Sequence, residues 1–184
     1  MSAVPIFGEK GEGRGSLRAS ASTSPLSLLP GVVVRAAVLS DVPQLEALMA
    51  PYVATGDLLP RSNYDLCRHI KEYVVAEALS EGGTIVGCGS LKVYSVALAE
   101  VAGLAVRPDW QGSGIGRALL EALLAEARTY GLAEVLALTR KPTFFQKLGF
   151  VAAEREHFPL KVWADCARCP RQNCCDEIAV VLRL

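Results

Sequence analysis

The chain has 184 residues, of which 51% are hydrophobic, and its 19 basic residues balance 19 acidic ones. This length and composition favour one globular domain with a sizeable core. The balanced charge argues against nucleic acid or an anionic membrane surface as a partner. No apolar run reaches the roughly 20 residues that a membrane-spanning helix needs. We therefore expect a cytoplasmic protein that acts on small molecules.

The N-terminal segment differs in composition from the rest of the chain. Residues 1–31 are rich in Ser, Gly and Pro, and they lack the positive start and continuous apolar segment of an export signal. We interpret them as a flexible tail that precedes a single domain at 32–184.

Within this domain the predicted elements follow the order β-α-α-β-β-β-α-β-α-β. The β-branched run VVVRAAV (32–38) predicts a strand, and Ser40 or Asp41 then caps a helix with apolar residues at helical spacing. The remaining expected elements are a loop at 55–62, a helix at 63–72, a hairpin with strands at 73–79 and 83–94, a strand at 96–106, a helix at 118–132 closed by Gly131, a strand at 134–139, a helical stretch from Pro142 to Gly149 and a strand at 178–184. This order predicts an α/β fold with a central mixed sheet flanked by helices.

The stretch RPDWQGSGIGRALL (107–120) places three glycines directly before the long helix. A dinucleotide site would need G-x-G-x-x-G after the first strand, but Arg117 stands where the third glycine would be required. A nucleotide-triphosphate loop would need a Lys-Ser/Thr pair, which is absent. The stretch can instead bring backbone N–H groups together at a helix N-terminus, where an anion such as a pyrophosphate is favoured. A simple turn from strand to helix is the alternative.

Residues 111–116, QGSGIG, preceded by LAVRPDW, resemble the Q/R-x-x-G-x-G/A signature of the Gcn5-related N-acetyltransferases (GNAT). The element order from 32 to 184 also resembles the whole GNAT fold. The resemblance implies acetyl-CoA as co-substrate, with its pyrophosphate on the loop amides and its pantetheine arm and acetyl carbonyl on the preceding strand. The implied cofactor-binding residues are Leu104, Ala105, Val106, Gln111, Gly112, Ser113, Gly114, Ile115, Gly116 and Arg117.

Acetyl transfer to an amine requires a base, because an amine near pH 7 is mostly protonated. Glu100 lies a few residues before the implied carbonyl-binding residues, and its position resembles that of the strand glutamate that serves as general base in several GNAT members. An ordinary surface glutamate is the alternative. Phe145 stands where many relatives have the Tyr that protonates the leaving thiolate. The Thr139 hydroxyl is therefore a candidate acid, beside solvent or the tetrahedral intermediate itself.

A combination of five segments resembles the short, single-domain N-acetylglutamate synthases of arginine biosynthesis. These segments are LLPRS (58–62), SLKVY (90–94), AEVAGLAV (99–106), LALTRKPTFF (136–145) and PLKVWADCARCP…CCDEIAVVL (159–182). The resemblance implies that Arg61 pairs with the distal carboxylate of L-glutamate and that main-chain amides near Leu59 and Gly103 receive its α-carboxylate. Lys92 and Lys161 are further cationic candidates.

Other acceptors and functions stay open at this point. Glutamine, another small amino acid, a protein or an aminoglycoside could take the acetyl group, and the chain could also be a non-catalytic acyl-CoA-binding module. The sequence does not set the oligomeric state, and a homodimer is open.

Four of the six cysteines, Cys166, Cys169, Cys174 and Cys175, crowd into one short segment. A structural zinc site usually draws on two separated pairs, and adjacent cysteines do not easily share one metal. We therefore expect no metal and favour reduced thiols or a labile disulfide between Cys166 and Cys169 or Cys175, with a zinc site as the alternative.

Overall fold

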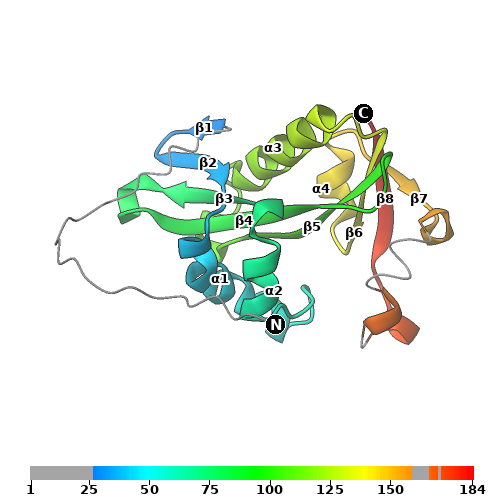
Figure 1. Ribbon diagram of the computed structural model, residues 1–184, viewed down its shortest axis with the longest axis horizontal. Helices are drawn as coiled ribbons and strands as arrows, with labels where there is room; N and C mark the ends of the chain where they lie inside the picture. Colours follow the sequence, from blue (N-terminus) through cyan, green and yellow to red (C-terminus); the bar gives the residue numbers. More distant parts are fainter. Residues whose placement is uncertain (1–26, 159–165, 170) are drawn as a thin grey trace, which may run out of the picture.

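The structure is a computed structural model that describes residues 27–158, 166–169 and 171–184 (Figure 1). Within these ranges the chain forms one mixed sheet of eight strands with helices on both faces, which confirms the predicted fold class. The strands are β1 Ser27–Leu29, β2 Val32–Ala36, β3 Tyr73–Ala78, β4 Thr84–Val93, β5 Leu98–Val106, β6 Glu134–Thr139, β7 Val151–Ala153 and β8 Ile178–Arg183. The helices are α1 Val42–Ala54, α2 Asn63–Arg68, α3 Ile115–Thr129 and α4 Pro142–Gln146, and the strands lie in the order β1-β2-β3-β4-β5-β6-β8-β7. None of the helices in these ranges is long and apolar enough to cross a membrane.

Two short strands are absent from the sequence prediction. The strand β1 pairs antiparallel with β2, so the sheet begins at Ser27, inside the segment 1–31 that was expected to be a tail. The strand β7 pairs antiparallel with β8. Strands of three residues contain too little alternation to be recognised, because they form through pairing with a longer neighbour rather than through their own pattern.

The predicted helix at 63–72 also divides into two pieces. A capping box formed by Ser62 and Asp65 starts α2, and Ser62 Oγ accepts the amide of Asp65 at 3.1 Å. At His69 the backbone leaves helical geometry (φ −108°, ψ 14°), and a 3-10 turn follows at Ile70–Glu72. This change of direction brings Ile70 into the core, where its side chain is buried.

Alternating residues of the central strands supply the cores on the two faces of the sheet. In β3, Val74 and Ala76 pack in the core that contains the buried side of α3, whereas Tyr73 and Val75 pack with α1 and α2. Figure 1 shows α3 on one face of the sheet and α1 with α2 on the other. The sheet is therefore covered where β3 to β5 lie, and its central strands are apolar on both faces.

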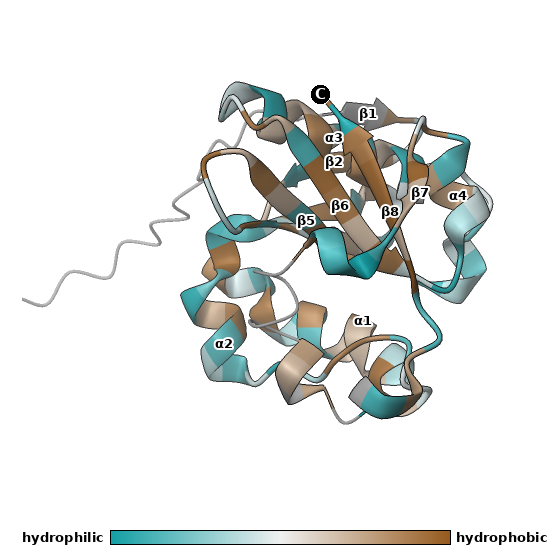
Figure 2. Ribbon diagram, turned by 90° about the vertical axis from the view of Figure 1, so that its right-hand side faces the viewer, coloured by the Kyte–Doolittle hydropathy of each residue, from teal (hydrophilic) through white to brown (hydrophobic). Residues whose placement is uncertain are grey.

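The strand β5 carries the two irregularities that create the site. A bulge at Gly103, which has a φ of +62°, shifts the register against β4 between Cys88 and Ser90. On its other edge, β5 pairs in parallel with β6 only from Leu98↔Glu134 to Glu100↔Leu136. Beyond Glu100 the two strands diverge, while β6 continues beside β8 through Thr139. Figure 2 views the molecule from this side and shows apolar residues along β6 and β8.

The close approach of α3 to β4 gives a stability prediction. A Cβ at Gly87 would lie 3.0 Å from both Ile115 Cγ2 and Leu119 Cδ1, so Gly87→Val overpacks this contact. We expect it to lower the free energy of unfolding by about 1–3 kcal/mol in urea titrations without ligand. The matched control is Gly116→Ala, whose Cβ would meet Phe144 at an ordinary 3.6 Å. The control should be neutral or stabilising by up to about 1 kcal/mol; equal destabilisation by both variants would contradict the packing argument.

Candidate active site

A cavity of about 470 Å³ opens between the diverging halves of β5 and β6. The α1–α2 loop, β4, the glycine loop, the start of α3 and the β6–α4 junction complete its wall. The structure brings most of the sequence-predicted site residues to this wall: Leu59, Arg61, Lys92, Glu100, Gly103, Leu104, Ala105, Val106, Gln111, Gly112, Gly114, Gly116, Arg117 and Thr139. Lys161 lies outside the described residues.

The glycine loop and the N-terminus of α3 form one end of the cavity. Gly112 and Gly114 have φ values of +82° and +90°, which only glycine adopts without strain, and a Cβ at either position would meet no atom within 4 Å. Gly114 is the N-cap of α3, whose first N–H groups have no acceptor within the helix. An open surface of amides at a helix N-terminus is suited to a phosphate group.

Two predicted residues of this loop do not line the cavity wall. The Ile115 side chain is 1% exposed and packs in the core beneath α3, so its side chain anchors the helix start. Ser113 Oγ donates to the carbonyl of Trp110 at 2.5 Å, so its hydroxyl serves the loop itself. The sequence pattern could not show which side chains of the loop face the cavity, because the backbone turns at the glycines with positive φ decide where each side chain points.

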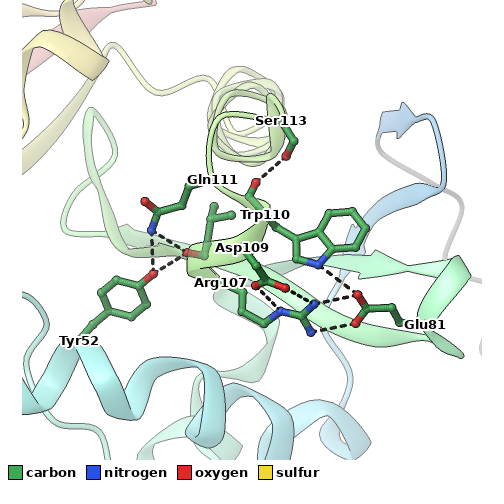
Figure 3. Close-up of polar contacts among 8 residues, drawn as sticks. Tyr52, Glu81, Arg107, Asp109, Trp110, Gln111 and Ser113 are labelled. Atoms are coloured by element: carbon green, nitrogen blue, oxygen red, sulfur yellow. Dashed lines mark hydrogen bonds and ion pairs between the residues drawn. The ribbon is translucent and has the colours of Figure 1, made fainter.

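The end of β5 is held to the glycine loop through its last carbonyl (Figure 3). The oxygen of Val106 accepts from the Tyr52 hydroxyl of α1 and, at 3.1 Å, from Gln111 Nε2. Gln111 Nε2 also donates to the Tyr52 hydroxyl oxygen at 3.0 Å. The Gln111 side chain therefore joins strand to loop, and Tyr52, which the sequence analysis did not identify, fixes both to α1.

Glu100 lies where β5 and β6 separate. Its residue is 3% exposed, and its Oε2 accepts from the Tyr94 hydroxyl at 2.6 Å. Lys92 is its partner in the antiparallel ladder between β4 and β5. Across the cavity, Thr139 ends β6, and its Oγ1 accepts the amide of Lys141 at 2.9 Å. In this contact Thr139 is the acceptor, so its own hydroxyl proton is available for a second partner.

Tyr73 is a further polar group of the wall that the sequence did not indicate. It is buried, and burial raises the pKa of its hydroxyl to about 12, with a smaller opposing effect of the Arg61 charge. The hydroxyl therefore stays protonated at neutral pH. Beside it, Ser90 Oγ donates to the carbonyl of Ala102 at 3.0 Å and thereby supports the bulge at Gly103.

Arg140 connects three segments of the chain at the cavity wall. Its Nη1 lies 2.7 Å from Asp57 in the α1–α2 loop, and its Nε lies 2.7 Å from Asp176 in the segment before β8. The pKa of Asp57 is lowered by hydrogen bonds from Thr55 and Arg140. The loop that carries Leu59 and half-buried Arg61 is thus connected to the end of β6.

The clustered cysteines Cys166, Cys169, Cys174 and Cys175 form no disulfide bond with one another in the structure. Arg155 Nη2 lies 3.2 Å from Cys175 Sγ and donates to the carbonyl of Glu177 at 2.9 Å. Among residues 27–158, 166–169 and 171–184, no group of three or more His, Cys, Asp or Glu side chains is arranged to hold a metal ion.

Comparison with known proteins identifies the family. The model of the acetyltransferase (GNAT) domain matches residues 69–152. An uncharacterised N-acetyltransferase of Chlorobaculum tepidum is 38% identical over 82% of this chain and 96% of its own length. An amino-acid acetyltransferase of Mycobacterium tuberculosis is 37% identical over 74% of this chain and 78% of its own length.

Two solved structures resemble this fold closely. N-acetylglutamate synthase from Neisseria gonorrhoeae, complexed with coenzyme A and N-acetyl-glutamate, has a TM-score of 0.73 at 32% identity and covers 83% of this chain. This chain covers only 35% of that enzyme. A Mycobacterium tuberculosis protein in complex with CoA and NLQ has a TM-score of 0.72 at 32% identity, with 83% of this chain and 99% of that chain covered. Because identity of this level extends over nearly the whole of one relative, this chain belongs to the GNAT family and is an acetyl-CoA-dependent N-acetyltransferase.

Proposed function

We propose that the chain transfers the acetyl group of acetyl-CoA to the α-amino group of L-glutamate, as an N-acetylglutamate synthase in the first step of arginine biosynthesis. The observation that carries this proposal is that the buried Glu100 residue lines one cavity together with the glycine loop and with Arg61 and Lys92. A base beside cationic groups suits an amine that also bears carboxylates. The amino-acid acetyltransferases and the Neisseria gonorrhoeae synthase among the relatives support the same substrate class.

The cofactor would extend along the wall from the glycine loop to Glu100. Amides of 112–117 would bind the pyrophosphate, each charge-assisted hydrogen bond contributing on the order of 1.5–3 kcal/mol. The edge of β5 from Val101 to Val106 has lost β6 as a partner, and its groups other than the Val106 carbonyl, which accepts from Tyr52 and Gln111, would then hydrogen-bond the pantetheine arm. The thioester would arrive near the bulge at Gly103, where main-chain N–H groups could stabilise charge on the carbonyl oxygen.

The chemistry would begin with removal of a proton from the substrate ammonium by Glu100, directly or through a water. The neutral nitrogen would attack the thioester carbonyl, and collapse of the tetrahedral intermediate would break the C–S bond. Tyr94 would orient Glu100 through its hydrogen bond. The Thr139 hydroxyl would relay a proton, taking the excess proton from the nitrogen of the tetrahedral intermediate as it gives its own to the departing thiolate, a role for which Phe145 has no polar atom.

The acceptor would be recognised through both of its carboxylates. Arg61 would bind the distal carboxylate in a bidentate pair, and amides near Leu59 and Gly103 would receive the α-carboxylate. Lys92 would add positive charge on the same side. Glutamine, whose side-chain amide is neutral, would lose the charge-assisted pair and should be the poorer acceptor.

A thiol-release assay across the common amino acids tests the substrate directly. We expect L-glutamate to give the highest kcat/KM, because its side-chain carboxylate can form a charge-assisted pair with Arg61 that a neutral side chain cannot form. Equal or faster turnover of glutamine would move the assignment to a neutral side chain. Coenzyme A binding without acetylation of any amine would overturn the enzymatic proposal.

Glu100→Gln should lower kcat by roughly 10²–10⁴-fold, because the amide cannot accept the proton. The dissociation constant for CoA, measured by calorimetry, should change little, since Glu100 lies beyond the thioester. Tyr94→Phe is the partner variant and should lower kcat less, because it removes only the orienting hydrogen bond. Unchanged turnover of the Gln variant would remove Glu100 from the mechanism.

Arg61→Ala should raise the KM for glutamate at least tenfold, because a bidentate charge-assisted pair contributes on the order of 1.5–3 kcal/mol or more. The KM for acetyl-CoA should stay within a factor of two or so, as the arginine lies on the acceptor side. Arg61→Lys retains the charge but not the planar fork, and it should recover part of the loss. Glutamate kinetics equal to the unaltered protein would reject this role.

Thr139→Val is nearly isosteric and should lower kcat by roughly tenfold or more if its hydroxyl supplies the proton to the thiolate. Single-turnover kinetics separate this effect from product release. A variant with unchanged kcat would leave solvent or the intermediate as the proton donor.

A further inference from the structure

A group of side chains beside the glycine loop has no role in the reaction described above. This loop brace consists of Glu81, Arg107, Asp109 and Trp110 (Figure 3). Glu81 comes from the 3-10 turn Leu79–Glu81 between β3 and β4, and Arg107 follows directly after β5. Asp109 and Trp110 belong to the 3-10 turn Pro108–Trp110, which leads into the glycine loop. The brace thus connects a hairpin distant in sequence to the start of the loop.

The Arg107 guanidinium uses most of its donors within this brace. Its Nη1 and Nη2 donate to the two carboxylate oxygens of Glu81, each at 2.8 Å. Its Nε and Nη2 donate to Asp109 at 2.7 and 2.8 Å. These hydrogen bonds raise the pKa of Arg107 and lower the pKa of both carboxyl groups, so all three groups are charged at neutral pH.

Trp110 attaches the brace to the loop. Its indole Nε1 donates to Glu81 at 3.2 Å, and the Arg107 guanidinium carbon lies 5.8 Å from the centre of its ring. The carbonyl of Trp110 accepts the Ser113 hydroxyl, and its amide donates to the carbonyl of Arg107 at 2.9 Å. Trp110 also lines the cavity. The contacts of the Trp110 side chain therefore restrain the backbone of the same residue, which hydrogen-bonds Arg107 on one side and Ser113 on the other.

The charges of the brace argue for a mechanical role. Two carboxylates near an anion-binding loop repel a phosphate-bearing ligand, and Arg107 neutralises only one of them. Single exposed ion pairs contribute little to stability, but a bidentate pair that shares an acceptor with an indole restricts three side chains to one geometry. Ordering a loop before the ligand arrives removes part of the entropy cost of binding.

We propose that Glu81 is a positioning residue for acetyl-CoA binding, which acts through Arg107 and Trp110 to hold residues 111–114 in the conformation that receives the pyrophosphate. Glu81 is not among the residues that line the cavity, so its effect would pass through its two partners. The inference concerns the cofactor alone and does not depend on glutamate as the acceptor.

The proposal is tested by the direction in which Glu81→Ala changes the affinity for CoA. Glu121→Ala is the matched control. Glu121 pairs with Arg117 at 2.8 Å near the same helix N-terminus, so both variants remove one negative charge beside the phosphate site. By charge alone, both should bind CoA more tightly. We expect calorimetry to show that Glu81→Ala weakens CoA binding roughly three- to tenfold, whereas Glu121→Ala leaves it unchanged or tighter.

Two further measurements separate positioning from a general loss of structure. In steady-state kinetics Glu81→Ala should raise the KM for acetyl-CoA without changing the KM for the amine. The double variant Glu81→Ala/Arg107→Ala should bind CoA about as weakly as Arg107→Ala alone, because both changes remove the same contact. CoA binding as tight as in the unaltered protein, or tightened equally in both alanine variants, would overturn the proposal. If Glu81→Ala does not fold, Glu81→Gln, which keeps the size but removes the ionic pair, provides the same comparison. Because CoA binding needs no acceptor, failure of the glutamate assay would leave this result intact.

Discussion

The separation of β5 from β6 after Glu100 is the constraint on which the other features of the site depend. Two parallel strands that pair over only a few residues and then diverge leave backbone groups on the facing edge of β5. Such groups must be satisfied by side chains, by water or by a ligand, since a buried unpaired amide is costly. The same divergence creates the cavity. Glu100 is the last residue of β5 that pairs with β6, and it lines the cavity at the point where the two strands separate. One departure from regular pairing thus leaves an unpaired strand edge, a cavity and a buried carboxylate side by side.

The remaining elements hold this open region in place from its margins. Tyr52 on α1 and Gln111 in the loop meet at the carbonyl of Val106, which fixes the outer end of β5. At the acceptor end, Arg140 connects the α1–α2 loop to the segment before β8. The cavity wall is therefore built from short polar contacts between segments far apart in sequence, whereas the apolar core lies on the covered parts of the sheet.

The polar groups along the cavity wall differ between the glycine loop and the region around Arg61. At the loop end, backbone amides and a helix N-terminus favour an anion without any buried side-chain charge. Away from the loop, the wall contains Arg61, Lys92 and Arg140 together with Asp57 and Glu100. This division is compatible with the proposed reaction, in which the amides would receive phosphate groups and the cationic side chains would receive the carboxylates of the amine.

Patterns that are local in the chain were readable from the sequence alone. The long elements, the glycine loop before α3, the apolar periodicity and the GNAT resemblance all depend on residues close to one another, and the family assignment agrees with them. Tertiary structure alone decided three features of the backbone and core: the three-residue strands β1 and β7, the turn at His69 and the inward direction of Ile115. It also decided which polar side chains meet around the site, namely Tyr52, Tyr73, Glu81, Tyr94 and Arg140. Most of these depend on which distant segments pack together, and the sequence carries no local signal for a hydrogen bond between residues that the sheet topology brings into contact. The sequence therefore determined which chemistry the chain contains, and the packing of β5 against its neighbours decided which side chains can take part in it.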